Sequence, residues 1–143
     1  MTTSSQAVPL DVEAMKVATA SKAAIWTGRV ISALIILFML FDAGIKVGKA
    51  SWAMEMSRQM GFTDGMIVGI GWACLISTIF YAIPQTAILG AILLTGYLGG
   101  AIAVNVFLKQ PLFNWIFAFT FGVLTWLGIY LREPRLRSIL FCR

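Results

Sequence analysis

The apolar positions of the chain fall into long runs separated by short polar stretches. Ala23–Phe41 contains one charge, Arg29, near its start. Gly65–Leu108 contains none, and as a single helix it would be about 66 Å long, twice the thickness of a bilayer core. Gln110–Leu131 is again free of charge. Such runs are typical of membrane-spanning helices, which need roughly 20 mainly apolar residues.

The second run must be divided, and the segment AIPQT marks the break. Pro84 has no amide hydrogen and disfavours helical backbone at the residue before it. The sequence therefore predicts an all-α integral membrane protein, an antiparallel bundle of four transmembrane helices. We expect the spans at 23–41, 66–83, 86–108 and 110–131.

The segments outside the spans are polar or basic. We expect residues 1–22 to form a flexible polar N-terminal tail, 23–132 the transmembrane domain and 133–143 a basic cytoplasmic tail. The apolar run begins too late and is too long for a cleavable signal peptide.

The first outer loop, Lys46–Asp64, has the periodicity of a short amphipathic helix that stops at Gly61. Its apolar face carries Trp52, Ala53, Met56 and Met60, and its polar face carries Glu55 and Arg58. This helix is predicted either to lie along the outer membrane surface or to pack over the mouth of the bundle.

Composition and charge agree with a lipid environment. The chain of 143 residues is 59% hydrophobic and 12% charged, and its net charge is +5. Of eleven basic residues, seven lie on the side of the two termini and four on the other side. The basic excess places both termini in the cytoplasm. These basic residues are expected to anchor the loops at the membrane surface. The lipid bilayer is the predicted partner, and no nucleic-acid partner is predicted.

The residues offer little catalytic chemistry. The chain has no histidine, and Cys74 and Cys142 lie far apart in sequence. No metal site, haem motif, flavin motif or catalytic residue is predicted, so the sequence favours a protein that is not an enzyme.

Small residues are concentrated in the third span. Gly90, Gly96, Gly99 and Gly100 predict close helix packing, because small residues let membrane helices approach each other. The third span is accordingly expected to be the central helix of the bundle. The alternative is a ligand slot beside Tyr97.

Asp42 ends the first span, and Lys46 follows one helical turn later. The order of acid before base at this spacing favours an interfacial ion pair. Alternatively, Asp42 and Lys46 line a polar pocket with Tyr97 and Asn105 of the third span, since Asn105 is expected at the same depth as Asp42.

Arg29 lies at the opposite, inner side of the first span. It is expected to extend its charge to the cytoplasmic headgroups, where it and Gln85 are candidates to contact a lipid phosphate.

Three segments together resemble a known family. GRVISALIILFMLFDAGIK, YAIPQTAILGAILLTGYLGGAIAVN and IYLREPRLRSIL are similar to the DoxX-like family of small four-helix bacterial membrane proteins. The resemblance implies a bacterial inner-membrane protein. Its broader superfamily includes subunits linked to thiosulfate:quinone oxidation and proteins associated with redox defence. Members often have a histidine after the glycine-rich segment, where this chain has Asn105.

Three functions remain open. The first is a non-catalytic accessory or scaffold component that works with another membrane or membrane-associated protein. The second, which enters only through the resemblance, is a membrane subunit of a quinone-linked redox system, with quinone as its cofactor. The third is a small oligomeric transporter, although such transporters use an acid deeper in the first span.

Overall fold

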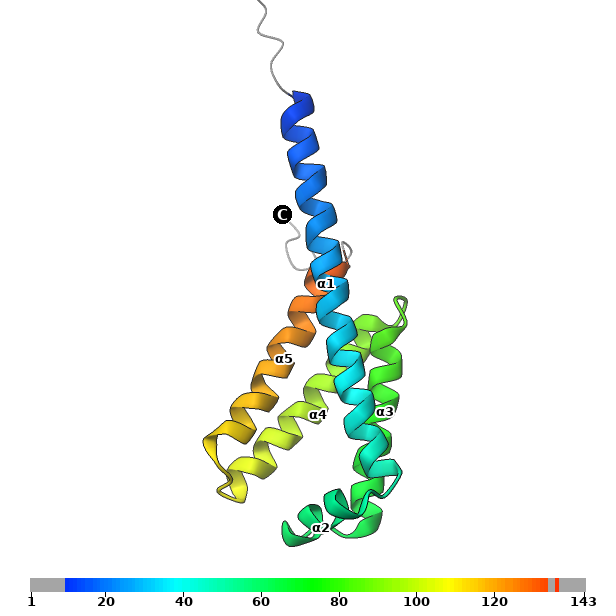
Figure 1. Ribbon diagram of the computed structural model, residues 1–143, viewed down its shortest axis with the longest axis vertical. Helices are drawn as coiled ribbons and strands as arrows, with labels where there is room; N and C mark the ends of the chain where they lie inside the picture. The colour runs from blue at the N-terminus through cyan, green and yellow to red at the C-terminus, as the bar shows by residue number, and fades with distance from the viewer. Residues whose placement is uncertain (1–9, 134–135, 137–143) are drawn as a thin grey trace, which may run out of the picture.

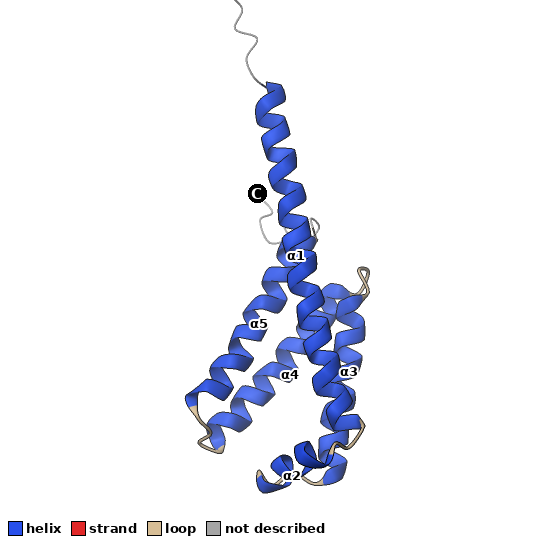
Figure 2. Ribbon diagram, viewed as in Figure 1, coloured by secondary structure: helices blue, strands red, loops and turns tan. Residues whose placement is uncertain are grey.

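The computed structural model describes residues 10–133 and 136, with residues 10–21 described by their backbone alone. The described chain is helical throughout (Figure 2), and its helices are connected by short turns. They are α1 (Leu10–Val47), α2 (Ser51–Gln59), α3 (Asp64–Ala82), α4 (Ala87–Phe107) and α5 (Leu112–Arg132). Four of them are long and apolar enough to cross a membrane, as the sequence predicts.

The helix α1 begins well before the expected start of the first span, so much of the segment expected as a flexible tail is helical. Leu10–Lys22 contains no glycine or proline and is rich in good helix formers, so helix propagates through it. Figure 1 shows this part of α1 extending far beyond the other helices. At its other end the span continues to Val47, which brings Asp42 and Lys46 into its last turns.

The four long helices form a ring in which each packs against two neighbours. α1 and α4 each pack against α3 and α5, and therefore lie across the ring from each other. Contacts between α1 and α3 include Met39 with Cys74 and Lys46 with Gly71. The expectation that the third span is a central helix is wrong, because α4 occupies an ordinary place in the ring and α3 buries the larger share of its residues.

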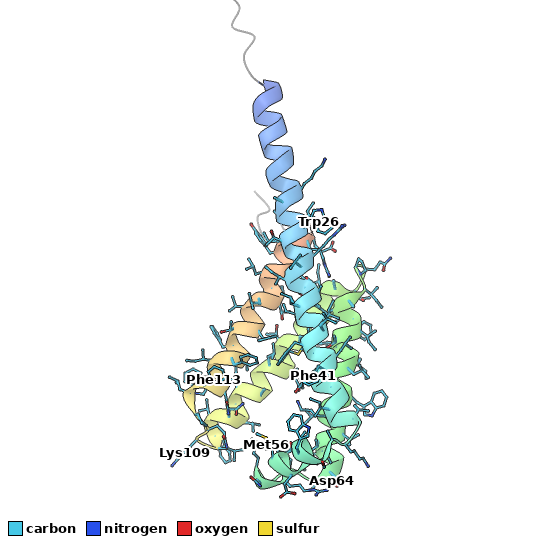
Figure 3. All side chains as sticks on the ribbon, viewed as in Figure 1. Trp26, Phe41, Met56, Asp64, Lys109 and Phe113 are labelled. Atoms are coloured by element: carbon cyan, nitrogen blue, oxygen red, sulfur yellow. The ribbon has the colours of Figure 1, made fainter. Side chains whose placement is uncertain are left out.

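The core is made of small and aliphatic side chains from all four long helices. Ala43, Cys74, Ala91, Leu94 and Ile129 have no exposed surface. Large apolar side chains point outward instead, among them Trp26, Phe41 and Phe113, all labelled in Figure 3. An apolar exterior is what lipid requires, so this distribution fits four spans surrounded by a bilayer.

The two ends of the ring differ in width. Toward the end that carries α2, α4 and α5 diverge from α1 and α3 (Figure 1). We call this the α2 end and the opposite one the Tyr81 end, after the buried tyrosine that lies there.

Candidate ligand pocket at the α2 end

Three polar side chains meet across the ring at the α2 end. The ammonium of Lys46 donates to Asp42 Oδ2 and to the Tyr97 hydroxyl, each over 2.6 Å. The Tyr97 hydroxyl in turn donates to Asp42 Oδ2 over 2.7 Å. The Asp42–Lys46–Tyr97 cluster therefore bridges α1 and α4, the two helices that face each other across the ring.

Local helix geometry explains half of this cluster. Asp42 and Lys46 are four residues apart on α1, so their side chains lie on one helix face. Their side chains are 31% and 23% exposed, which shields the pair from water more than a surface ion pair. Tyr97 comes from a helix fifty residues further along, and only the fold brings it within reach.

Beside the cluster lies a cavity of about 560 Å³, which we call the pocket. Parts of α1, α2, α3 and α4 line it. Most of its wall is apolar, including Met56, Ile67 and Val104, while Asp42, Lys46 and Tyr97 provide polar groups. Ligand sites in proteins are usually mostly apolar cavities of roughly this size with a few placed polar groups.

The glycines of α4 fall into two groups. A Cβ on Gly90 would collide with the backbone of Tyr81, so helix packing requires a glycine there. A Cβ on Gly96, Gly99 or Gly100 would meet no described atom within 4 Å. The packing role expected for these three glycines is therefore absent from the described chain. Gly96 and Gly100 instead line the pocket, whose volume depends on their missing side chains.

Asn105 lines the pocket but does not join the polar cluster. Its side-chain amide donates to the carbonyl oxygen of Ala101, one turn earlier in the same helix, over 2.8 Å. Asn105 and Asp42 line the same cavity, in agreement with the similar depth expected for them. No hydrogen bond joins the two side chains among the described residues.

The short helix α2 covers one side of the pocket. Trp52, Ala53 and Met56 of α2 line the pocket, as does Met60, which follows the helix. Figure 3 shows Met56 on the side of α2 that faces the bundle.

Both ends of the α2 segment turn sharply. Lys49 before it and Gly61 after it have positive φ angles of 53° and 89°, and each occupies the left-handed position of a Schellman cap. Across the turn at Gly61, Arg58 of α2 donates two hydrogen bonds to the carboxylate of Asp64, each over 2.7 Å. These hydrogen bonds raise the pKa of Arg58 and attach α2 to the start of α3.

A second polar cluster lies at the Tyr81 end, and no pattern in the sequence predicts it. The Tyr81 hydroxyl donates to the carbonyl oxygen of Thr125 over 3.0 Å and lies 3.2 Å from Ser32 Oγ. Arg132 donates to the Tyr81 carbonyl oxygen over 3.1 Å, and its guanidinium lies 5.4 Å from the Tyr81 ring. Tyr81 itself is completely buried.

Glycines close this end. A Cβ on Gly128 would lie 2.8 Å from Ser32 Oγ and 3.0 Å from the Tyr81 hydroxyl, and one on Gly28 would lie 2.8 Å from the backbone nitrogen of Arg132. The only sequence signal for this arrangement is a set of isolated small residues in three different spans, which carries no pairing information.

Arg29 and Gln85, the candidate headgroup contacts, are both exposed. No hydrogen bond joins them in the part of the chain that the structure describes. Among the same residues, no group of three histidine, cysteine or acidic side chains is placed to hold a metal ion. The lining of the pocket consists of hydrogen-bonding groups and apolar surface.

Comparison with known proteins identifies the family of the chain. No curated protein and no solved structure matches the chain significantly. The model of the DoxX-like family matches residues 30–128, which include Asp42, Lys46, Tyr97 and Asn105. Since the match covers more than half of the sequence, the chain belongs to the DoxX-like family.

Proposed function

We propose that this multi-pass membrane protein is a non-catalytic accessory component that holds a small membrane-soluble molecule in the pocket. The observation that carries the proposal is the pocket itself, a mostly apolar cavity of about 560 Å³ with the Asp42–Lys46–Tyr97 cluster in its wall. The cluster's side chains bond to one another, which suits a binding site with a fixed geometry.

We place the protein in the bacterial inner membrane as an antiparallel bundle with both termini in the cytoplasm. The excess of basic residues on the side of the termini supports this orientation. The α2 end then lies at the outer face, with α2 at the membrane surface above the pocket. Arg29 and Gln85 lie near the Tyr81 end, where contact with the phosphate of a cytoplasmic-leaflet lipid is part of the same proposal.

The test is to identify small molecules that remain bound during purification. Mass spectrometry of organic extracts should show a molecule that is retained by the wild type and lost from Gly96→Leu, whose new side chain fills the pocket. Gly99→Leu is the matched control, because Gly99 has the same free space around it and does not line the pocket. Equal retention by all three proteins would contradict the proposal.

A membrane subunit of a quinone-linked redox system is the second candidate. It is favoured by the Lys46 ammonium, which lies in the wall of an apolar cavity and could donate to a quinone carbonyl. A quinone in the extract of the wild type, absent from Gly96→Leu, would support this candidate.

A small oligomeric transporter is the third candidate. It is less well supported, because Asp42 is already bonded to Lys46 and Tyr97 and lies close to the end of its helix.

The first candidate, an accessory component, also implies a protein partner, which cross-linking in intact membranes would reveal.

A further inference from the structure

We infer that the pocket selects an uncharged amphiphile whose head both accepts and donates hydrogen bonds, such as a hydroxyl or a primary amide. This inference rests on the proposed function and adds the chemical class of the ligand. It follows from the groups in the Asp42–Lys46–Tyr97 cluster that remain available, from the charge of the cluster and from the shape of the pocket.

The hydrogen bonds within the cluster leave one donor and one acceptor free. A lysine ammonium has three N–H groups, and Lys46 uses two of them on Asp42 and Tyr97. Tyr97 accepts from Lys46 and donates to Asp42, so its hydroxyl hydrogen is occupied. Both bonds to Asp42 end on Oδ2, and no described residue donates to Oδ1. Since Asp42 and Lys46 both line the pocket, a ligand head has one ammonium hydrogen and one carboxylate oxygen with which to bond.

The cluster also rejects charged heads. Asp42 and Lys46 carry opposite charges 2.6 Å apart, so their sum is zero. An anionic head that approaches Lys46 meets the carboxylate of Asp42, and a cationic head that approaches Asp42 meets Lys46. Neither charge would find a counter-charge to offset its loss of hydration against the apolar wall. A hydroxyl or amide escapes this cost because it is neutral and satisfies both free groups.

The rest of the pocket suits an apolar body. Gly96 and Gly100, one helical turn apart on α4, leave a strip of that helix without side chains. Ile67, Ile70 and Met60 provide apolar surface elsewhere in the wall. An alkyl chain or ring that lies along the glycine strip would cover apolar surface while its head reaches the cluster.

The test uses photoreactive probes that share one alkyl chain with a diazirine and differ only in the head. The heads are a primary alcohol, a methyl ketone, a carboxylate and a trimethylammonium group. The purified full chain in lipid nanodiscs is labelled with each probe, and labelled peptides are quantified by mass spectrometry. We expect the alcohol to label pocket peptides about tenfold more than either charged probe, and more than the ketone, which cannot donate to Asp42. Gly96→Leu should remove this labelling and Gly99→Leu should preserve it.

Two charge variants keep the test decisive if Gly96→Leu folds poorly. Asp42→Asn leaves Lys46 unbalanced and should shift labelling toward the carboxylate probe, and Lys46→Gln should shift it toward the ammonium probe. Ketone labelling equal to that of the alcohol, or stronger labelling by a charged probe that Gly96→Leu removes, would overturn the ligand class and leave the pocket as a binding site. Labelling that no head and no variant changes would contradict the proposed function as well.

Discussion

The two ends of the bundle use the same residue types for opposite purposes. At the Tyr81 end, a tyrosine hydroxyl bonds to neighbouring helices, and Gly28, Gly90 and Gly128 let those helices touch. At the α2 end, Tyr97 also bonds across helices, yet Gly96 and Gly100 border open space. One end is closed by contact between backbones, and the other encloses a pocket.

The difference shows that a glycine in a membrane helix does not by itself indicate close helix packing. Gly90 and Gly96 lie on the same helix, less than two turns apart, and only the presence or absence of an opposing backbone separates their roles. We therefore expect stability to depend on the Tyr81 end and ligand binding to depend on the α2 end.

The largest effect should come from Gly90→Leu. A Cβ at this position collides with the backbone of Tyr81, which no side-chain rotation can relieve, so we expect a loss of about 3 kcal/mol in the free energy of unfolding. Thermal unfolding in detergent would measure it. Gly96→Leu is the paired variant and should unfold near the wild-type temperature. Similar losses for both variants would erase the distinction between the two ends.

The next largest difference in stability is expected between the Tyr81→Phe and Tyr97→Phe variants. Tyr81→Phe removes a buried hydroxyl and leaves the Thr125 carbonyl oxygen without that donor, which should cost about 1–2 kcal/mol of stability. Tyr97→Phe should cost less, because Asp42 and Lys46 remain bonded within α1, and it should preserve labelling by the alcohol probe, because the groups that the ligand head uses belong to Asp42 and Lys46. Chemical unfolding and probe labelling of both variants would sharpen the comparison, and a reversed order of stabilities would contradict it.

Double-mutant cycles should show which polar side chains at the α2 end interact with Asp42. Asp42 bonds to Lys46 and Tyr97, while Asn105 bonds within its own helix, so we expect coupling energies of about 1 kcal/mol for 42–46 and 42–97 and near zero for 42–105. Suitable substitutions are Asp42→Asn, Lys46→Gln, Tyr97→Phe and Asn105→Ala, measured by unfolding. Strong coupling only between positions 42 and 105 would show that the cluster is arranged differently.

The smallest effect should come from Gly96→Ala. The added methyl group meets no described atom within 4 Å, and alanine favours helix over glycine, so stability should rise by up to about 1 kcal/mol. The same substitution at Gly90 is the contrasting variant and should lower stability. A loss of stability at Gly96 would indicate that an unseen neighbour contacts this position.

The sequence predicted the spans well because lipid imposes a simple rule on composition. The long apolar runs correspond to the four long helices, and Pro84 lies in the turn between α3 and α4. The extension of α1 was missed because polar residues suggested a tail, although helix propensity is independent of burial. The helical start at Leu10 shows that propensity decided the outcome there.

The members of the candidate site can be predicted in part, and their hydrogen bonds cannot. Asp42 and Lys46 follow from their spacing, and depth along the spans suggests Tyr97 and Asn105 near them, but the bonds of Tyr97 to Asp42 and Lys46 depend on packing. The contrast between Gly90 and Gly96 could not be predicted, because it depends on which helix lies opposite each residue. The Tyr81 cluster was missed for the same reason, since Ser32, Thr125 and Arg132 are unremarkable in sequence and meet only through packing.

The close pairing of Asp42 with Lys46 has an electrical consequence. An elementary charge that crosses the membrane exchanges about 2.3 kcal/mol with a potential of 100 mV. A neutral pair held within one helical turn presents almost no net charge to that potential, whether or not the helix moves. With an uncharged ligand in the pocket, neither binding nor release would carry current. Occupancy should therefore follow the concentration of the ligand in the membrane and be independent of whether the cell is energised.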